Sequence, residues 1–246
     1  MKKYELVFDA PLVRRMPVVL RVDGRAFSKL SKKLDKPFDS RFTSAMDAVT
    51  HALCREIQGA VFGYYQSDEA SILIVDYKNL ASEPWFDGRV QKMCSIAGSI
   101  ATLAFYKAFS SLPSKLFESL AFDARVFNVP REDATNYFIW RQRDCERNSV
   151  SMLASHHFSH KDLMGVKREE KIERLKFFKG IDWFDIAPAL QRGACVSKET
   201  GVVTGSNVLR THWKTDSDIP IFAQDREYIE KHLAVTDEKE QMKKNR

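Results

Sequence analysis

Apolar residues group into short runs and helical repeats over the first half of the chain. Runs at 17–22, 60–65, 70–76 and 122–129 predict four strands, and the middle two form a hairpin. A helix that Asp39 or Ser40 caps and Gly59 ends is predicted from apolar positions at helical spacing, namely Phe42, Met46, Val49, Leu53 and Ile57. A second helix is expected over about 89–109. The order strand, helix, strand, strand, helix, strand is the split pattern of ferredoxin-like domains.

The pattern changes after residue 132. Helices are predicted over about 133–158 and 160–178, strands at 194–197 and 202–213, and a final helix near 225–233. Tyr137 and Trp140, on the first of these helices, are expected to be core residues. We therefore predict an α+β protein with three parts: a palm-like catalytic core at 1–132, a helical and short β-strand extension packed on it at 133–235, and a polar tail at 236–246 that frays.

Composition and charge limit the class of protein. With 246 residues, 44% hydrophobic and 29% charged, the chain fits an ordinary globular protein with one large domain. No signal peptide or membrane-spanning run is expected, and four scattered cysteines without a CxxC pair predict a reducing, cytoplasmic location. The net charge of +6 favours a polyanionic partner, although basic runs on a helix are equally typical of a solvated face.

Two acidic segments carry the candidate chemistry. Asp23-Gly24 lies where the first strand is expected to break, and Asp68-Glu69 lies at the hairpin tip. A strand end and a hairpin tip of one sheet can bring Asp23 and Asp68 together, and two converging carboxylates without a cationic partner are typical Mg²⁺ ligands. This arrangement predicts phosphoryl or nucleotidyl transfer by metal ions about 3.5–4 Å apart. Taken singly, each segment is better explained as a polar turn, and the metal site is predicted from the two together.

Five ordered motifs give a family resemblance. They are Arg21-Val22-Asp23-Gly24-Arg25-Ala26-Phe27, Lys36-Pro37-Phe38-Asp39-Ser40-Arg41, Gln66-Ser67-Asp68-Glu69, Phe122-Asp123-Ala124-Arg125 and Trp140-Arg141-Gln142-Arg143-Asp144-Cys145. In order and spacing this set resembles the tRNA-histidine guanylyltransferase family, from about residue 4 to at least residue 193. The resemblance implies a polymerase- or cyclase-type palm, ATP and GTP or other nucleoside triphosphates as substrates, tRNA as partner, and a homo-oligomer, specifically a tetramer.

The same resemblance implies roles for individual residues. Asp23, the Gly24 carbonyl and Asp68 match the ligands of two Mg²⁺ ions, and Glu69 matches an acidic catalytic position. A triphosphate site is implied at the backbone amides of Arg25, Ala26, Phe27 and Ser28, with Lys36 and Ser67 near the phosphates and Asp39 near the base. Asn148, Arg168, Lys171 and Arg174 are expected to contact RNA or phosphate.

One segment departs from the pattern. Histidine-tRNA-specific eukaryotic members carry His-Ile-Asn-Asn-Leu-Tyr-Asn after the Trp-Arg-Gln motif, whereas this chain has Glu146-Arg147-Asn148-Ser149-Val150-Ser151-Met152, and Ser28 replaces a histidine. Both changes resemble the guanylyltransferase-like branch, which repairs truncated tRNA 5′ ends against a template strand. The prediction is thus a Mg²⁺-dependent 3′-to-5′ nucleotidyltransferase. The alternatives are a dedicated enzyme adding one G at position −1, a nucleotide cyclase and a silent RNA-binding module.

Overall fold

The computed structural model describes residue 4 and residues 9–79, 81–109, 120–202 and 209–235. Within them the chain forms one six-stranded antiparallel sheet in the order β4-β1-β3-β2-β5-β6. The strands are β1 (Val18–Arg25), β2 (Ala60–Gln66), β3 (Glu69–Ile74), β4 (Ala121–Asn128), β5 (Ala194–Val202) and β6 (Leu209–Asp216). The order β4-β1-β3-β2 is that of a ferredoxin-like palm, so the predicted fold class is confirmed.

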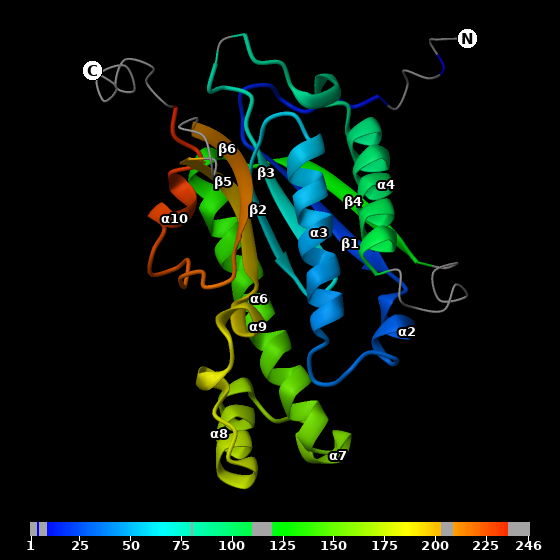
Figure 1. Cartoon of the computed structure of the whole chain (residues 1–246), viewed down its shortest axis with the longest axis vertical. Helices are drawn as coiled ribbons and strands as arrows, with labels where there is room; N and C mark the ends of the chain where they lie inside the picture. The colour runs from blue at the N-terminus through cyan, green and yellow to red at the C-terminus, as the bar shows by residue number, and fades with distance from the viewer. Residues whose placement is uncertain (1–3, 5–8, 80, 110–119, 203–208, 236–246) are drawn as a thin grey trace.

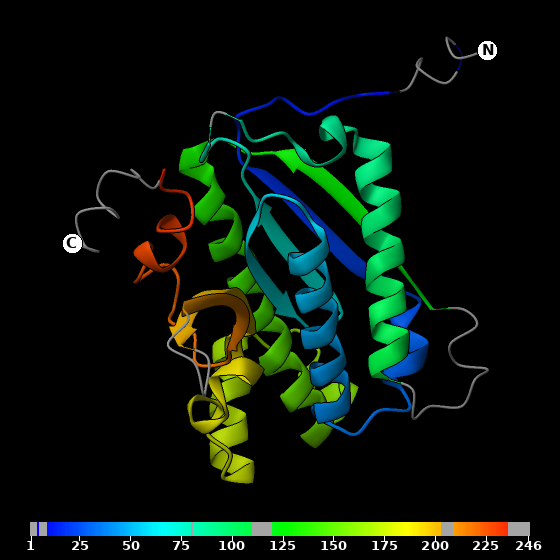
Figure 2. The same cartoon turned by 45° about the horizontal axis from the view of Figure 1, so that its top comes forward.

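Helices cover both faces of this sheet. Figures 1 and 2 show α3 (Ser40–Glu56) and α4 (Val90–Ala108) on one face and α6 (Arg131–His157) on the other. The alternation along β1 explains the two layers, because Leu20 and Val22 join the core under α3 and α4, whereas Val19 joins the core under α6. Odd-numbered residues of β1 therefore face α6.

The first strand is longer than its apolar run predicts. β1 continues through Asp23 to Arg25, because Asp23 pairs with Glu69 of β3 on one side and with Asp123 of β4 on the other. The expected break at Asp23-Gly24 is wrong, and the turn falls at Ala26, which has φ 64° and precedes the short helix α2 (Phe27–Ser31). Gly24 is needed inside the strand, since a Cβ there would lie 2.6 Å from the Phe27 ring.

The extension differs from prediction in three places. The single helix expected over 160–178 is wrong: α7 (His160–Leu163) and α8 (Arg168–Lys179) are separate, and Gly165 between them has φ 75°. The expected strand limits at 197 and 202 are also wrong, because β5 runs on to Val202 and pairs with β6, which begins at Leu209. Only α10 (Glu227–Glu230) is helical in the region of the predicted final α-helix. The predicted tail at 236–246 lies outside the described residues.

A distal lobe extends below the sheet in the view of Figure 1. It consists of the C-terminal end of α6, α7, α8 and the 3₁₀ turn η3 (Trp183–Asp185), and it has its own small core of Val150, Leu153, Ala154, Ile172, Leu175 and Trp183. The short helix α9 (Pro188–Arg192) then leads back to β5, and a 3₁₀ turn, η2 (Trp85–Gly88), precedes α4. No helix in the described part of the chain is long and apolar enough to cross a membrane.

Candidate active site

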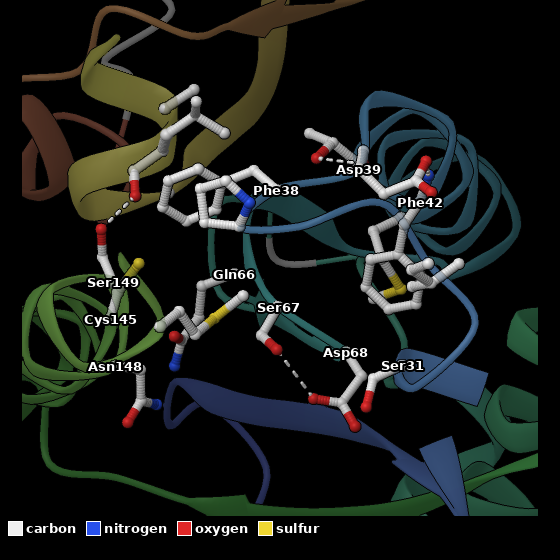
Figure 3. A pocket seen from close by; sticks show the side chains of 18 of the residues that line it. Ser31, Phe38, Asp39, Phe42, Gln66, Ser67, Asp68, Cys145, Asn148 and Ser149 are labelled. Atoms are coloured by element: carbon white, nitrogen blue, oxygen red, sulfur yellow. Dashed lines mark hydrogen bonds between the residues drawn. The ribbon is translucent and has the colours of Figure 1, made fainter. Parts of the chain in front are cut away.

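The two predicted carboxylates meet at one end of the central strands. Asp23 lies directly opposite Glu69 in the β1–β3 ladder, and the Gly24 amide donates a hydrogen bond of 3.0 Å to the Asp68 carbonyl. Ser67 has φ 48°, a left-handed turn conformation that directs the chain from β2 into β3. Its hydroxyl donates to Asp68 Oδ1 at 3.1 Å (Figure 3). The hairpin tip therefore holds Asp68 beside Asp23, as the sequence predicts.

The surroundings oppose ionisation of Asp68. Burial raises the pKa of the Asp68 carboxyl above its usual range, and the nearby Asp23 charge raises it further. Among the described residues, neither Asp23 nor Asp68 has a cationic side chain within 4.0 Å, and no three or more His, Cys, Asp and Glu side chains are arranged so that they could hold a metal ion without other ligands. Two neighbouring carboxylates and the Gly24 carbonyl offer hard oxygen ligands of the kind that Mg²⁺ binds together with water and phosphate.

Glu69 has a different environment from its neighbour Asp68. The residue is only 6% exposed, and its carboxylate accepts two hydrogen bonds of 2.7 Å from Arg141 Nε and Nη2. Arg21 Nη1 lies 3.9 Å from Glu69 Oε2. Burial raises the pKa of Glu69, while both arginines oppose that shift. The acid expected to be catalytic is thus held in a bidentate ion pair that joins β3 to α6.

Sequence reasoning missed Arg141 as the partner of this acid. Arg141 also donates to Asp144 Oδ2 at 2.9 Å, and its Cζ lies 4.4 Å from the centroid of the Trp140 ring. The available signal was helical phase, because Tyr137, Arg141 and Cys145 recur every fourth residue and share the buried face of α6. Trp140 lies off that face and is 50% exposed, so its predicted core position is wrong, whereas that of Tyr137 is confirmed.

A cavity of about 390 Å³ opens beside Asp68. It lies between the hairpin tip, the segment that joins α2 to α3, and α6 (Figure 3). Its lining includes Phe27, Lys36, Phe38, Asp39, Gln66, Ser67, Asp68, Cys145, Asn148, Ser149 and Met152. The volume is in the range of small-molecule sites, and Asp68 belongs both to the lining and to the carboxylate pair.

The predicted nucleotide positions divide into two groups. Lys36 and Ser67 line the cavity with exposed side chains, whereas the Arg25-to-Ser28 segment, which contains the left-handed turn at Ala26, reaches the lining through Phe27. The Ser28 side chain lies outside the described part. Phe27 is a buried core residue whose ring centroid lies 5.0 Å from that of Phe122.

Asp39 caps α3 as well as lining the cavity. Its carboxylate accepts from the amides of Asp35 and Arg41 and from Arg41 Nη2 at 2.6 Å. The hydrogen bonds from Arg41 and these amides hold the pKa of this carboxyl well below its usual range. The group expected near the base is therefore already bound to the protein by several donors.

The predicted RNA-contacting residues lie along the distal lobe. Asn148 lines the cavity, and Lys171 Nζ donates to Ser151 Oγ at 3.2 Å on the same side of α6. Arg168 lies 3.5 Å from Glu146 and over the Trp183 ring at 5.1 Å. Arg174 donates to the Asp162 carbonyl at 2.7 Å and so ties α8 to α7. These contacts connect α8 to Glu146–Met152, the segment in which this chain differs from the histidine-tRNA-specific pattern.

A ferredoxin-like sheet with two neighbouring carboxylates, Asp23 on β1 and Asp68 at the β2–β3 tip, next to a cavity of nucleotide size, is typical of the palm-type class of nucleotide-transferring proteins. Within that class, residues 1–130 match the family model described as tRNAHis guanylyltransferase. The chain belongs to this family and is a nucleotidyltransferase.

Solved structures and curated relatives agree with this assignment. A bacterial tRNA(His) guanylyltransferase-like protein in complex with ATP superposes with a TM-score of 0.88 at 36% identity, over 96% of this chain and 98% of that chain. A complex of such a bacterial protein with GTP gives 0.83 at 34% identity, over 95% and 96%. A probable tRNA(His) guanylyltransferase of Dictyostelium discoideum is 32% identical over 157 residues, covering 60% of this chain and 59% of the relative.

Proposed function

We propose that this protein adds nucleotides to the 5′ end of tRNA in the 3′-to-5′ direction, depends on Mg²⁺, and uses the opposite strand as template to repair that end. The observation that carries the proposal is the position of Asn148, Ser149 and Met152. These residues belong to the segment where the chain departs from the histidine-tRNA-specific pattern, and they line the cavity beside Asp68.

The cavity is suited to a nucleoside triphosphate. Apolar walls from Phe38, Phe42 and Met152 provide a surface for the base, while Lys36 and Ser67 provide a charge and a hydroxyl for phosphate oxygens. Backbone amides of the Arg25-to-Ser28 turn add donors next to Asp23. The two bacterial structures with ATP and GTP support triphosphates as the substrates.

The carboxylate pair supplies the metal site. Asp23, the Gly24 carbonyl and Asp68 would hold Mg²⁺, since Asp23 and Asp68 lack a cationic partner among the described residues. Bound there, Mg²⁺ would lower the pKa of the attacking hydroxyl and neutralise charge on the leaving group. The ion pair with Arg141 supports a positioning role for Glu69 behind Asp23 rather than a ligand role.

The reaction needs no protein nucleophile. The 5′-monophosphate of the RNA first attacks the α-phosphorus of ATP or GTP and pyrophosphate leaves. The 3′-hydroxyl of the incoming triphosphate then attacks the activated 5′-phosphorus and the nucleoside monophosphate leaves. Positioning of the two ends accounts for most of the rate that such a site contributes. The fixed geometry of β1 and the β2–β3 tip supports that role, because β1 is paired on both sides and the tip joins two paired strands of the same sheet.

One assay separates this function from its alternatives. The protein is incubated with labelled GTP or ATP, Mg²⁺ and a 5′-monophosphorylated tRNA that lacks its first nucleotide. We expect label to enter RNA only when RNA and Mg²⁺ are both present. Conversion of free triphosphate without RNA would indicate a cyclase, and RNA binding without any labelled product would indicate a silent binding module.

The family resemblance also leads us to propose a tetramer. Light scattering at several concentrations checks this point, and a constant monomer mass of 28.3 kDa would contradict it.

A further inference from the structure

Trp140 lies on α6 and has no role in the proposed reaction. Half of its surface is open to solvent, although it follows Tyr137 by one turn of a helix that packs on the sheet. Arg141 Cζ lies 4.4 Å from the ring centroid, and the Tyr137 ring packs against it edge-on at 5.9 Å. An open aromatic ring that its neighbours already hold in place loses little freedom when another ring stacks on it.

A short chain of contacts relates Trp140 to the carboxylates. The Arg141 guanidinium, which lies against the Trp140 ring, forms the bidentate ion pair with Glu69. Glu69 lies directly opposite Asp23 in the β1–β3 ladder. Tyr137, the other neighbour of Trp140, packs on Phe127 of β4 at 5.8 Å. The indole therefore lies over the β1–β4 side of the sheet, on the face that bears Asp23.

The same face carries exposed positive charge. Arg25 of β1 and Arg125 of β4 are on the α6 side of the sheet by register, and Arg147 follows Trp140 by two turns of α6. The side chains of Arg125 and Arg147 are 55% and 57% exposed. Arg125 donates to Asp123 and Arg147 donates to Asp144, each through Nη2. The other N–H groups of both guanidinium groups are available to a ligand. We call Arg25, Arg125, Trp140 and Arg147 the open palm face.

We propose that the open palm face binds the end of the RNA acceptor duplex, with the first base pair stacked on Trp140 and the flanking phosphates against Arg125 and Arg147. An indole combined with exposed guanidinium groups is complementary to a flat base and its phosphate backbone. The inference rests on the proposed function, and it gives the RNA end a place beside Asp23 and Asp68 that is separate from the triphosphate cavity.

The test uses the full chain and a blunt RNA duplex of acceptor-stem sequence with a 5′-monophosphate. 2-Aminopurine replaces either the 5′-terminal base or an internal base, and no triphosphate is added. We expect the wild-type protein to quench the terminal probe and leave the internal probe unchanged. Trp140→Ala should remove the quenching and weaken duplex binding about tenfold, in line with the removal of one base–aromatic stack. Trp140→Phe should keep most of both signals.

Leu103→Ala is the matched control. Leu103 is 53% exposed on α4, which covers the opposite face of the sheet, so this variant should behave as wild type. Unchanged quenching and affinity in Trp140→Ala would overturn the inference, as would equal quenching of the terminal and the internal probe by the wild-type protein. Nucleotide addition by the same preparations distinguishes the two proposals. Normal addition by Trp140→Ala with unchanged binding refutes only the stacking site, whereas a wild-type protein that neither binds nor extends RNA refutes the proposed function as well.

Discussion

At the scale of single residues, Asp68 combines partial burial with a neighbouring like charge. Because its pKa is raised in the folded protein, the native state keeps this proton to a higher pH than the unfolded chain does. Metal-free protein should therefore lose stability as the pH rises from about 3.8 through the raised pKa. A cation that binds the carboxylates should restore that stability by mass action.

Asp68→Asn tests this account. We expect the variant to melt at a higher temperature than wild type at pH 7 without Mg²⁺, because the amide has no charge to bury. It should also show a smaller rise in Tm when Mg²⁺ is added. Thermal unfolding with and without Mg²⁺ at several pH values measures both effects. A variant that is less stable than wild type without metal would contradict the raised pKa as the cause.

Asp23→Ala and Asp68→Ala should each abolish nucleotide addition while the fold persists. The expected loss reflects removal of a metal ligand, whereas folding should lose little because a repulsive neighbour disappears. Single-turnover addition assays and circular dichroism on the same samples check this pair of outcomes. Near-normal turnover in either variant would exclude the metal site.

Replacing Arg141 should destabilise the folded protein, although Arg141 has no direct role in the proposed reaction. Arg141→Ala leaves Glu69 buried without its partner, so we expect a loss of about 3–5 kcal/mol in the free energy of unfolding. Glu69→Gln combined with Arg141→Met should recover part of that loss, because residue 69 no longer carries a buried charge, although Arg21 then loses its 3.9 Å contact with the Glu69 carboxylate. Urea unfolding of the single and double variants measures this coupling, and additive losses would argue against the pair.

At the scale of elements, α6 is the structural link between the palm and the distal lobe. Its residues Tyr137 and Arg141 contact the sheet, Cys145 and Asn148 line the cavity, and Leu153 belongs to the core of the lobe. A 27-residue helix can join three regions because its buried face changes partner along its length. The lobe is thereby held in a defined position relative to the cavity.

The position of α8 against α6 leads to a prediction on RNA binding. Arg168, Lys171 and Arg174 replaced together by alanine should weaken tRNA binding and flatten its dependence on salt, by about 0.9 in the logarithmic slope for each duplex phosphate that the variant no longer neutralises. Because Arg174 also ties α7 to α8, Lys171→Ala alone is the cleaner variant. Filter binding between low and moderate salt provides the slopes. Identical slopes would show that these cations only solvate the helix.

Much of this architecture was predictable from local patterns, and the failures have physical causes. The strands and α3 follow from apolar periodicity and from the Asp39 cap, and the meeting of Asp23 with Asp68 follows from the hairpin. The length of β1 was not predictable from its apolar run, because pairing on both sides extends it through charged residues. The Glu69–Arg141 pair spans 72 positions and forms only when α6 packs on the sheet.

At the scale of the whole molecule, dependence on a template base distinguishes 5′-end repair from the addition of a single guanosine. If the template base selects the incoming nucleotide, kcat/KM should be higher for a tRNA lacking its first nucleotide, with any of the four template bases opposite, than for guanosine addition to full-length tRNA-histidine opposite adenosine. Correct pairing places the 3′-hydroxyl, and a displacement of about 1 Å can cost a hundredfold in rate. The comparison requires identical Mg²⁺ and salt. A clear preference for the full-length tRNA-histidine would identify a dedicated guanylyltransferase.

The position of β5 in the sheet limits how the chain can be divided. β5 pairs with β2 from Phe62 to Tyr65, and it comes from the extension rather than from the first 132 residues. A fragment ending at residue 132 would leave the backbone N–H and C=O groups of β2 open along an apolar edge, which is a template for pairing with other copies. The segment that matches the family model is therefore expected to aggregate when it is expressed alone.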